Sequence, residues 1–152
     1  MSHMDGEILI QNRRAGFDYE ILETFHAGMD LLGSEVKALK FGRGNIAGAH
    51  IILRGGEAYA VNMDIPPYQP GNAPKGYEAA RTRRLLLTRA ELNDLTGMIH
   101  KNGLTLVPIR VYIKGRRVKM EFGLGRGKKK ADKREAIKKR EWSRLRRDIE
   151  TR

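Results

Sequence analysis

Two pairs of short β-rich segments, each joined by a tight turn, constrain the fold of this chain more than any other feature. Residues 49–53 and 58–63 flank the turn "RGGE", and the segments "TLVPIRVYI" and "RVKMEFGL" flank the turn "KGR". Glycine supplies the positive φ that tight hairpin turns require. Both pairs are therefore predicted to be antiparallel hairpins, with Pro108 at an edge or a bulge.

A further strand is expected over residues 18–25, "DYEILETF". Its residues Tyr19, Ile21 and Phe25 recur at a spacing that places them near one face, with acids between them. Residues 66–77, "PPYQPGNAPKGY", contain too much proline and glycine to pair in a sheet. This composition predicts an exposed loop.

Two segments carry helix signals. Over residues 88–103, Thr88 and Glu91 have the spacing of a capping box ahead of an apolar stripe. Over residues 33–42, "GSEVKALKFG", Ser34 is the expected cap. Several short strands and two or three helices predict a mainly β fold, a small closed antiparallel barrel with flanking helices and a basic C-terminal tail.

The predicted organisation is a body over residues 1–122 and a tail over 123–152. Residues 1–4, "MSHM", resemble an expression scar. The tail holds 13 Lys/Arg against 5 Asp/Glu, which is two thirds of the net charge of +12. Such a field attracts a polyanion, and nucleic acid is favoured over a membrane because a basic membrane helix would carry a broader apolar face.

The apolar residues of the tail form one narrow helical stripe, Trp142, Leu145 and Ile149, with Lys/Arg at most other positions. Like charges four residues apart oppose an isolated helix. We therefore expect the tail to be disordered when free and helical on a polyanion. A solvated tail and a helix packed permanently by Trp142 are the alternatives.

The sequence gives no sign of catalysis, metal binding or membrane insertion. Gly123, Gly125 and Gly127 precede Lys128, but a Walker loop requires Ser or Thr where this chain has Lys129. These glycines instead predict a flexible hinge after the last strand. With no cysteine, four scattered histidines and no long apolar run, we expect no metal, no cofactor, no enzyme activity and a cytoplasmic location.

Ordered motifs along the chain resemble one family. They are "NRRA" at residues 12–15, "GSEVKALK" at 33–40, "RTRRLLL" at 81–87, "GLTLVPIRVY" at 103–112 and "RGKKKADKR" at 126–134. Together they resemble the bacterial SsrA-binding protein family over nearly the whole chain.

This resemblance implies an oligonucleotide-binding-type barrel without catalytic activity, a monomer that binds the tRNA-like domain of transfer-messenger RNA. It implies delivery of that RNA to stalled ribosomes for trans-translation, with elongation factor Tu in the delivery complex. The tail would enter the empty messenger channel and reach the decoding centre of the small subunit. A general structured-RNA binder or accessory ribosomal protein is the main alternative. A ribonuclease or nucleotidyl transferase would need clustered carboxylates, which the sequence does not offer.

The family's functional residues map onto two sets of positions. The resemblance implies RNA contacts by the body at Asn12, His26, Lys37, Arg81, Arg83, Leu86 and Lys119. It implies ribosome contacts by the tail at Arg126, Lys128, Lys129, Asp132, Lys133, Arg134, Trp142 and Ile149.

Several of these positions have a second reading. His26 replaces an acid that is usual in the family, and Ala131 replaces an aromatic residue or histidine. Leu86 could instead belong to the core, and Asp132 could cap a helix. The arginines at 81–84 could be ordinary solvated residues, or they could act with exposed Tyr68 or Tyr77 in RNA recognition.

Overall fold

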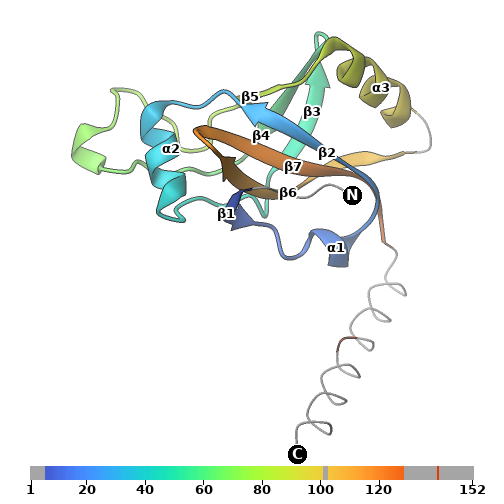
Figure 1. Cartoon of the computed structure of the whole chain (residues 1–152), viewed down its shortest axis with the longest axis horizontal. Helices are drawn as coiled ribbons and strands as arrows, with labels where there is room; N and C mark the ends of the chain where they lie inside the picture. The colour runs from blue at the N-terminus through green and yellow to red at the C-terminus, as the bar shows by residue number, and fades with distance from the viewer. Residues whose placement is uncertain (1–5, 101–102, 129–139, 141–152) are drawn as a thin grey trace, which may run out of the picture.

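The computed structural model describes residues 6–100, 103–128 and 140. Its elements in chain order are β1 (Glu7–Gln11), α1 (Ala15–Asp18), β2 (Tyr19–Met29), α2 (Gly33–Lys40), β3 (His50–Arg54), β4 (Glu57–Val61), a 3-10 turn (Pro70–Asn72), β5 (Arg83–Leu86), α3 (Arg89–Ile99), β6 (Thr105–Lys114) and β7 (Arg117–Gly127). Figure 1 shows α2 and α3 at opposite ends of a curled sheet. The mainly β class is confirmed.

The strands of this part of the chain form one antiparallel sheet in the order β1-β6-β7-β2-β5-β4-β3. The sheet curls until β3 contacts β6, five places away. The predicted closed barrel is nevertheless wrong. Strands β1 and β3 are the two end strands of the described sheet, and no ladder joins β3 to β1 or to β6, where β1 pairs only with residues 110–113.

Both predicted hairpins are confirmed. Arg54 pairs with Glu57 across the first turn, where Gly55 and Gly56 have φ of 60° and 76°. This double positive φ matches the twist of the flanking strands. In the second hairpin, β6 and β7 meet at a turn that contains Gly115, with φ of 63°. The ladder of that hairpin shifts between Pro108 and Arg110, so the bulge expected at the proline is also present.

Strand β2 differs from its prediction because it contains a bulge. Its register against β7 shifts between Ile21 and Glu23. Ile21 therefore pairs with Gly125 on one face of the sheet, whereas Phe25 pairs with Phe122 and stacks on it at 5.7 Å between ring centroids. The prediction that Phe25 shares a face with Tyr19 and Ile21 was wrong, since one extra residue inverts the alternation.

The predicted hinge over residues 123–127 is also wrong, because this segment is the end of β7. Gly123 pairs with Thr24 of β2 and Val107 of β6, and Gly123 is buried. The predicted boundary after Phe122 thus falls inside a strand. Glycine is required here for space, since a Cβ on Gly123 would lie 2.8 Å from Cγ2 of Ile21.

We expect Gly123→Ala to lower the free energy of unfolding by about 1–3 kcal/mol. The new methyl group would overlap the branched side chain of Ile21, which is stiff at χ1. Gly127→Ala is the matched control, because its Cβ would meet nothing within 4 Å. Urea unfolding of both variants measures the difference, and equal stability of the two would contradict the packing described for β7.

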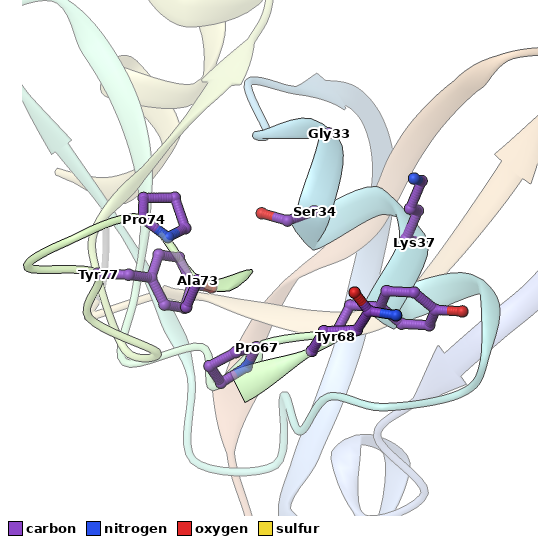
Figure 2. A pocket seen from close by; sticks show the side chains of 9 residues that line it. Gly33, Ser34, Lys37, Pro67, Tyr68, Ala73, Pro74 and Tyr77 are labelled. Atoms are coloured by element: carbon purple, nitrogen blue, oxygen red, sulfur yellow. The ribbon is translucent and has the colours of Figure 1, made fainter. Parts of the chain in front are cut away.

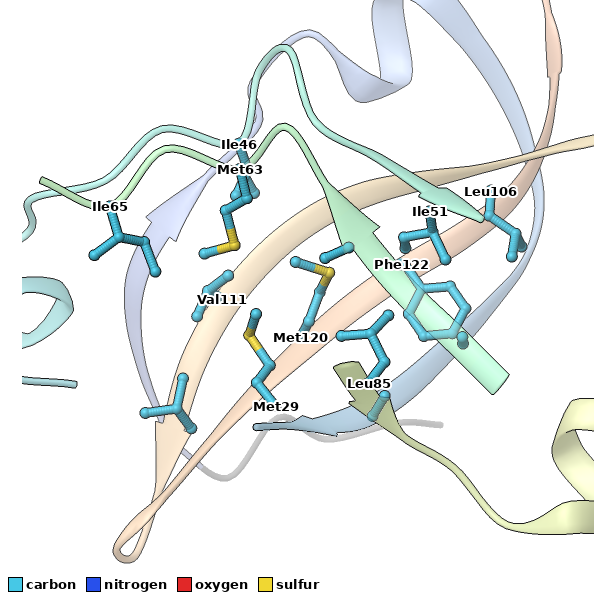
Figure 3. Close-up of a cluster of buried hydrophobic side chains, with 14 of the residues drawn as sticks. Met29, Ile46, Ile51, Met63, Ile65, Leu85, Leu106, Val111, Met120 and Phe122 are labelled. Atoms are coloured by element: carbon cyan, nitrogen blue, oxygen red, sulfur yellow. The ribbon is translucent and has the colours of Figure 1, made fainter. Parts of the chain in front are cut away.

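The hydrophobic core lies on the concave side of the sheet. Alternate residues of β7 (Val118, Met120, Phe122) point into it and meet side chains of the facing strands, as Figure 3 shows for Met120 and Phe122. Leu85 of β5 and Val111 of β6 are fully buried in the same cluster. The outer face of strands β5, β2 and β7 is left for other contacts.

The helices close the two ends of the sheet. In α3 the capping box is confirmed, with the Glu91 amide donating to Thr88 Oγ1 at 3.2 Å and the Thr88 amide to Glu91 Oε1 at 3.0 Å. In α2 the predicted cap Ser34 is wrong, because Leu32 precedes the helix and its amide donates to Glu35 Oε1 at 2.8 Å. Glu35 is thereby drawn into the protein interior.

Candidate nucleic-acid interface

A row of three residues crosses the outer face of the sheet. Gly28 of β2 pairs with Leu86 of β5 on one side and with Lys119 of β7 on the other. Two of the predicted RNA-contact residues, far apart in sequence, therefore flank a glycine that adds no side chain between them. Leu86 is 47% exposed, so the alternative that it belongs to the core is wrong. The structure brings Leu86 and Lys119 together at one place.

This row lies in a groove with a volume of about 470 Å³. Apolar groups line it from β2, from the segment between β2 and α2, which supplies Leu31, and from α2, which supplies Val36. Cations line it from the β6–β7 hairpin. The cations are Arg116, Arg117 and Lys119, and none of the lining residues is acidic. The cations of the groove suit a polyanion, and its apolar residues suit flat bases. Nucleic acid offers both.

Arg116 and Arg117 are groove residues that the sequence prediction missed. The alternation of "RVKM" gives a signal for Arg117, because buried Val118 and Met120 leave Arg117 and Lys119 on the opposite face. Arg116 belongs to the turn, where alternation gives no information.

Beneath α2, a buried ionic network joins two of the predicted contact residues to one carboxylate. Arg83 donates from Nη2 to Glu35 Oε2 at 2.5 Å and from Nε at 2.8 Å, and both side chains are fully buried. Arg81 binds the same carboxylate through Nη2 and Nε. Tyr77 donates its hydroxyl to Glu35 Oε2 at 3.1 Å and to the carbonyl of Ile65 at 2.7 Å.

This network assigns Arg83 to the interior and holds the half-buried Tyr77 by its hydroxyl. Arg83 also donates to the carbonyls of Met63, Arg81 and Ala79, so every side of its guanidinium faces the protein. A direct RNA contact by Arg83 is therefore incompatible with this arrangement. Arg81, with 30% of its side chain exposed, and Tyr77, which is half-buried, reach the surface from the network.

The Glu35 carboxyl is held in its charged form. Burial alone would raise its pKa, but hydrogen bonds from Arg81, the Leu32 amide and Arg83, with the charge of Arg83, outweigh burial and lower the pKa to about 2. Burial, reinforced by the charge of Glu35, raises the pKa of Tyr77, so the phenol stays neutral and donates.

The depressed pKa of Glu35 predicts acid sensitivity. A carboxyl that ionises more readily in the folded state contributes stability above its unfolded pKa, and that stability is lost as the pH falls through the folded pKa. For Glu35 the window runs from 4.5 down to about 2. We expect a loss of about 3 kcal/mol across it from this group. Urea unfolding of the wild type and of Glu35→Gln at pH 5, 3.5 and 2 measures this, and the gap between them should shrink as the pH falls. A constant gap would contradict the assignment.

His26 lies on the same outer face but is turned toward its neighbour. Its Nδ1 is 2.8 Å from the hydroxyl of Tyr112, and its Nε2 is buried without a hydrogen-bond partner among the described residues. Burial, with the charge of Glu121, raises the pKa of Tyr112. The hydrogen bond to Tyr112 and the burial of Nε2 hold the imidazole against the sheet, so it lies beside the groove and does not project from the sheet face.

The remaining predicted residues of the body lie elsewhere. Asn12 donates from Nδ2 to the Pro108 carbonyl at 3.2 Å and accepts from the Arg14 amide, so it fixes a turn beyond β1. Lys37 is exposed on α2 but lines a different pocket, shown in Figure 2, beside Tyr68.

Two of the predicted tail residues lie at the end of β7. Arg126 is exposed and pairs with Glu20, and Lys128 donates from Nζ to the Gly16 carbonyl at 2.9 Å. The other predicted tail residues lie outside the described part of the chain: Lys129, Asp132, Lys133, Arg134, Trp142 and Ile149. Among residues 6–100, 103–128 and 140 there is no helix that could cross a membrane and no group of three or more potential metal ligands.

The curled antiparallel sheet and its cationic groove define a small basic β protein with a surface suited to a polyanion. The family model described as SmpB protein matches residues 9–151. The chain therefore belongs to the SmpB family.

Relatives and a solved structure agree with this assignment. The SsrA-binding protein of Gloeobacter violaceus is 50% identical over 144 residues, which covers 95% of this chain and 92% of the relative. That of Mesoplasma florum is 46% identical and covers 91% and 93%. A chain from the solved structure "tmRNA-SmpB: a journey to the center of the bacterial ribosome" is 41% identical with a TM-score of 0.67, covering 84% of this chain and 93% of that chain.

Proposed function

We propose that this protein binds the tRNA-like domain of transfer-messenger RNA and delivers it to stalled ribosomes for trans-translation. The observation that carries the proposal is the groove, which joins Leu86 and Lys119 across Gly28 in a chain of the SmpB family. Relatives named SsrA-binding protein and a similar chain from a tmRNA-SmpB structure support this reading.

In this proposal the two parts of the groove have different tasks. Lys119, Arg116 and Arg117 neutralise phosphates, which supplies most of the affinity and makes it salt-dependent. Leu86 packs against an unstacked base or a sugar, which a duplex backbone alone would not offer. The buried network positions this surface, because Arg83 and Glu35 anchor β5 to α2 on either side of the groove.

The remaining features are part of the same proposal. The curled sheet acts as an oligonucleotide-binding-type surface, and residues 129–152 enter the messenger channel and reach the decoding centre. Elongation factor Tu accompanies a monomer of this protein in the delivery complex, in the cytoplasm. The protein's own residues bind and position RNA and carry out no catalytic step. A general structured-RNA binder would share the groove but would not distinguish one tRNA-like fold from another.

We expect Lys119→Ala to weaken binding of the tRNA-like domain about tenfold and to reduce the slope of log affinity against log salt by about 1. Lys114→Ala is the matched control, because it removes the same charge from the same hairpin at an exposed position outside the groove. Fluorescence anisotropy at several salt concentrations measures both quantities. Equal losses for the two variants would mean that net charge, not the groove, determines binding.

A further inference from the structure

The C-terminal end of α2 carries an exposed aromatic stack. Phe41 is 66% exposed, yet its ring lies on Tyr68, with 5.2 Å between centroids and 28° between ring planes. The Arg43 guanidinium lies 5.9 Å from the centroid of Tyr68 and donates to the Tyr68 carbonyl at 3.0 Å. The stack on Tyr68 thus holds the Phe41 ring in place, while most of the surface of Phe41 remains in water. We call Phe41, Tyr68 and Arg43 the aromatic platform.

The platform adjoins a pocket on the side of α2 away from the groove. Residues Ser34, Lys37 and Phe41 are spaced by three and four along the chain, which places them on one face as α2 ends. Ser34, Lys37 and Tyr68 line this pocket, as Figure 2 shows, whereas Val36 lines the groove. The platform is therefore a second surface, separated from the groove by the helix itself.

The two segments that form the platform, residues 33–43 and 66–77, expose only positive charges among their described residues. Lys37, Lys40 and Arg43 are exposed. The only acid between residues 33 and 43 is Glu35, which is buried and bound to Arg81 and Arg83. The loop of residues 66–77 that supplies Tyr68 contains one lysine and no acid. An anionic ligand with a flat apolar part complements this surface.

We propose that the aromatic platform binds one unpaired nucleotide of an RNA. The base stacks on the exposed face of Phe41, and Lys37 and Arg43 bind its phosphates. Stacking on a fixed ring flanked by cations is how proteins commonly hold single-stranded bases. This inference rests on the proposed function and adds a contact outside the groove to it.

Two oligonucleotide probes separate stacking from charge. The full chain is titrated with a fluorescent adenylate ribohexamer and with an abasic ribose-phosphate hexamer of equal charge. We expect Phe41→Ala to weaken binding of the adenylate hexamer about 5- to 150-fold and to leave the affinity for the abasic hexamer unchanged. Phe41→Tyr should bind like the wild type, while Phe41→Leu, which keeps apolar area without a ring, should bind as weakly as Phe41→Ala. Leu22→Ala, another exposed apolar residue, is the control and should have no effect.

The outcomes distinguish this inference from the proposed function. Wild-type affinity of Phe41→Ala for the adenylate hexamer would overturn the platform, and so would rescue by Phe41→Leu, which would indicate an apolar protein or lipid partner. If either result occurs while Lys119→Ala still weakens binding of the tRNA-like domain, only the platform proposal is wrong. If the wild type shows no preference for the tRNA-like domain while the Phe41 series behaves as expected, the platform stands and the proposed function is wrong.

Discussion

Glu35→Gln is expected to lower the free energy of unfolding by about 3–5 kcal/mol. The substitution keeps the shape of the side chain but removes the charge that compensates Arg83, which is fully buried. An uncompensated buried cation is far more costly than a lost surface ion pair. Because domains of this size are stable by about 5–15 kcal/mol in total, a large share of the stability would be lost. Urea unfolding at pH 7 measures it.

Two further variants show whether the loss comes from the ion pair. Glu23→Gln removes an exposed carboxylate from β2 and should change the stability by less than about 0.5 kcal/mol. In a double-mutant cycle, Arg83→Met combined with Glu35→Gln should cost less than the sum of the two single variants. Additive effects would show that Glu35 and Arg83 act independently, which would contradict the network.

Replacing Lys133 and Arg134 together by alanine is expected to abolish tagging on stalled ribosomes while leaving affinity for the free tRNA-like domain within about twofold. In the proposed division of labour the groove binds the free RNA and the tail acts only on the ribosome. Peptide tagging in a reconstituted translation system, with anisotropy for the free RNA, measures the two activities separately.

Lys138→Ala with Lys139→Ala is the matched control for the tail, because it removes the same two charges from the same segment. If the effect were only electrostatic attraction to ribosomal RNA, both pairs would reduce tagging equally. A collapse of free-RNA affinity in the Lys133 and Arg134 variant would contradict the division between body and tail.

Local signals in the sequence were sufficient for the hairpins and for α3. The turn glycines at 55, 56 and 115 and the capping box of Thr88 and Glu91 act within a few residues, so a single sequence contains the whole interaction. The bulge in β2 could not be predicted in this way. Its effect on Ile21 and Phe25 depends on which β7 residues they face, and that register is set by packing across the sheet.

The interior role of Arg83 was equally inaccessible from the sequence. Glu35 lies 48 residues away and has the exposed-looking context of a helical acid. The resemblance to a family identified Leu86 and Lys119, which the structure brings together, but it gave no way to separate residues that face the ligand from residues such as Arg83 that hold the surface in place. Burial in the folded protein makes that distinction.

The central claim is preference for one tRNA-like fold, and competition binding at physiological salt tests it most directly. The full chain is bound to labelled tRNA-like domain of transfer-messenger RNA and challenged with bulk elongator tRNA. We predict that elongator tRNA competes only at more than about tenfold higher concentration than the unlabelled tRNA-like domain, since charge attraction alone treats both RNAs alike. Equal competition by the two RNAs would contradict the claim and would identify a general RNA-binding protein.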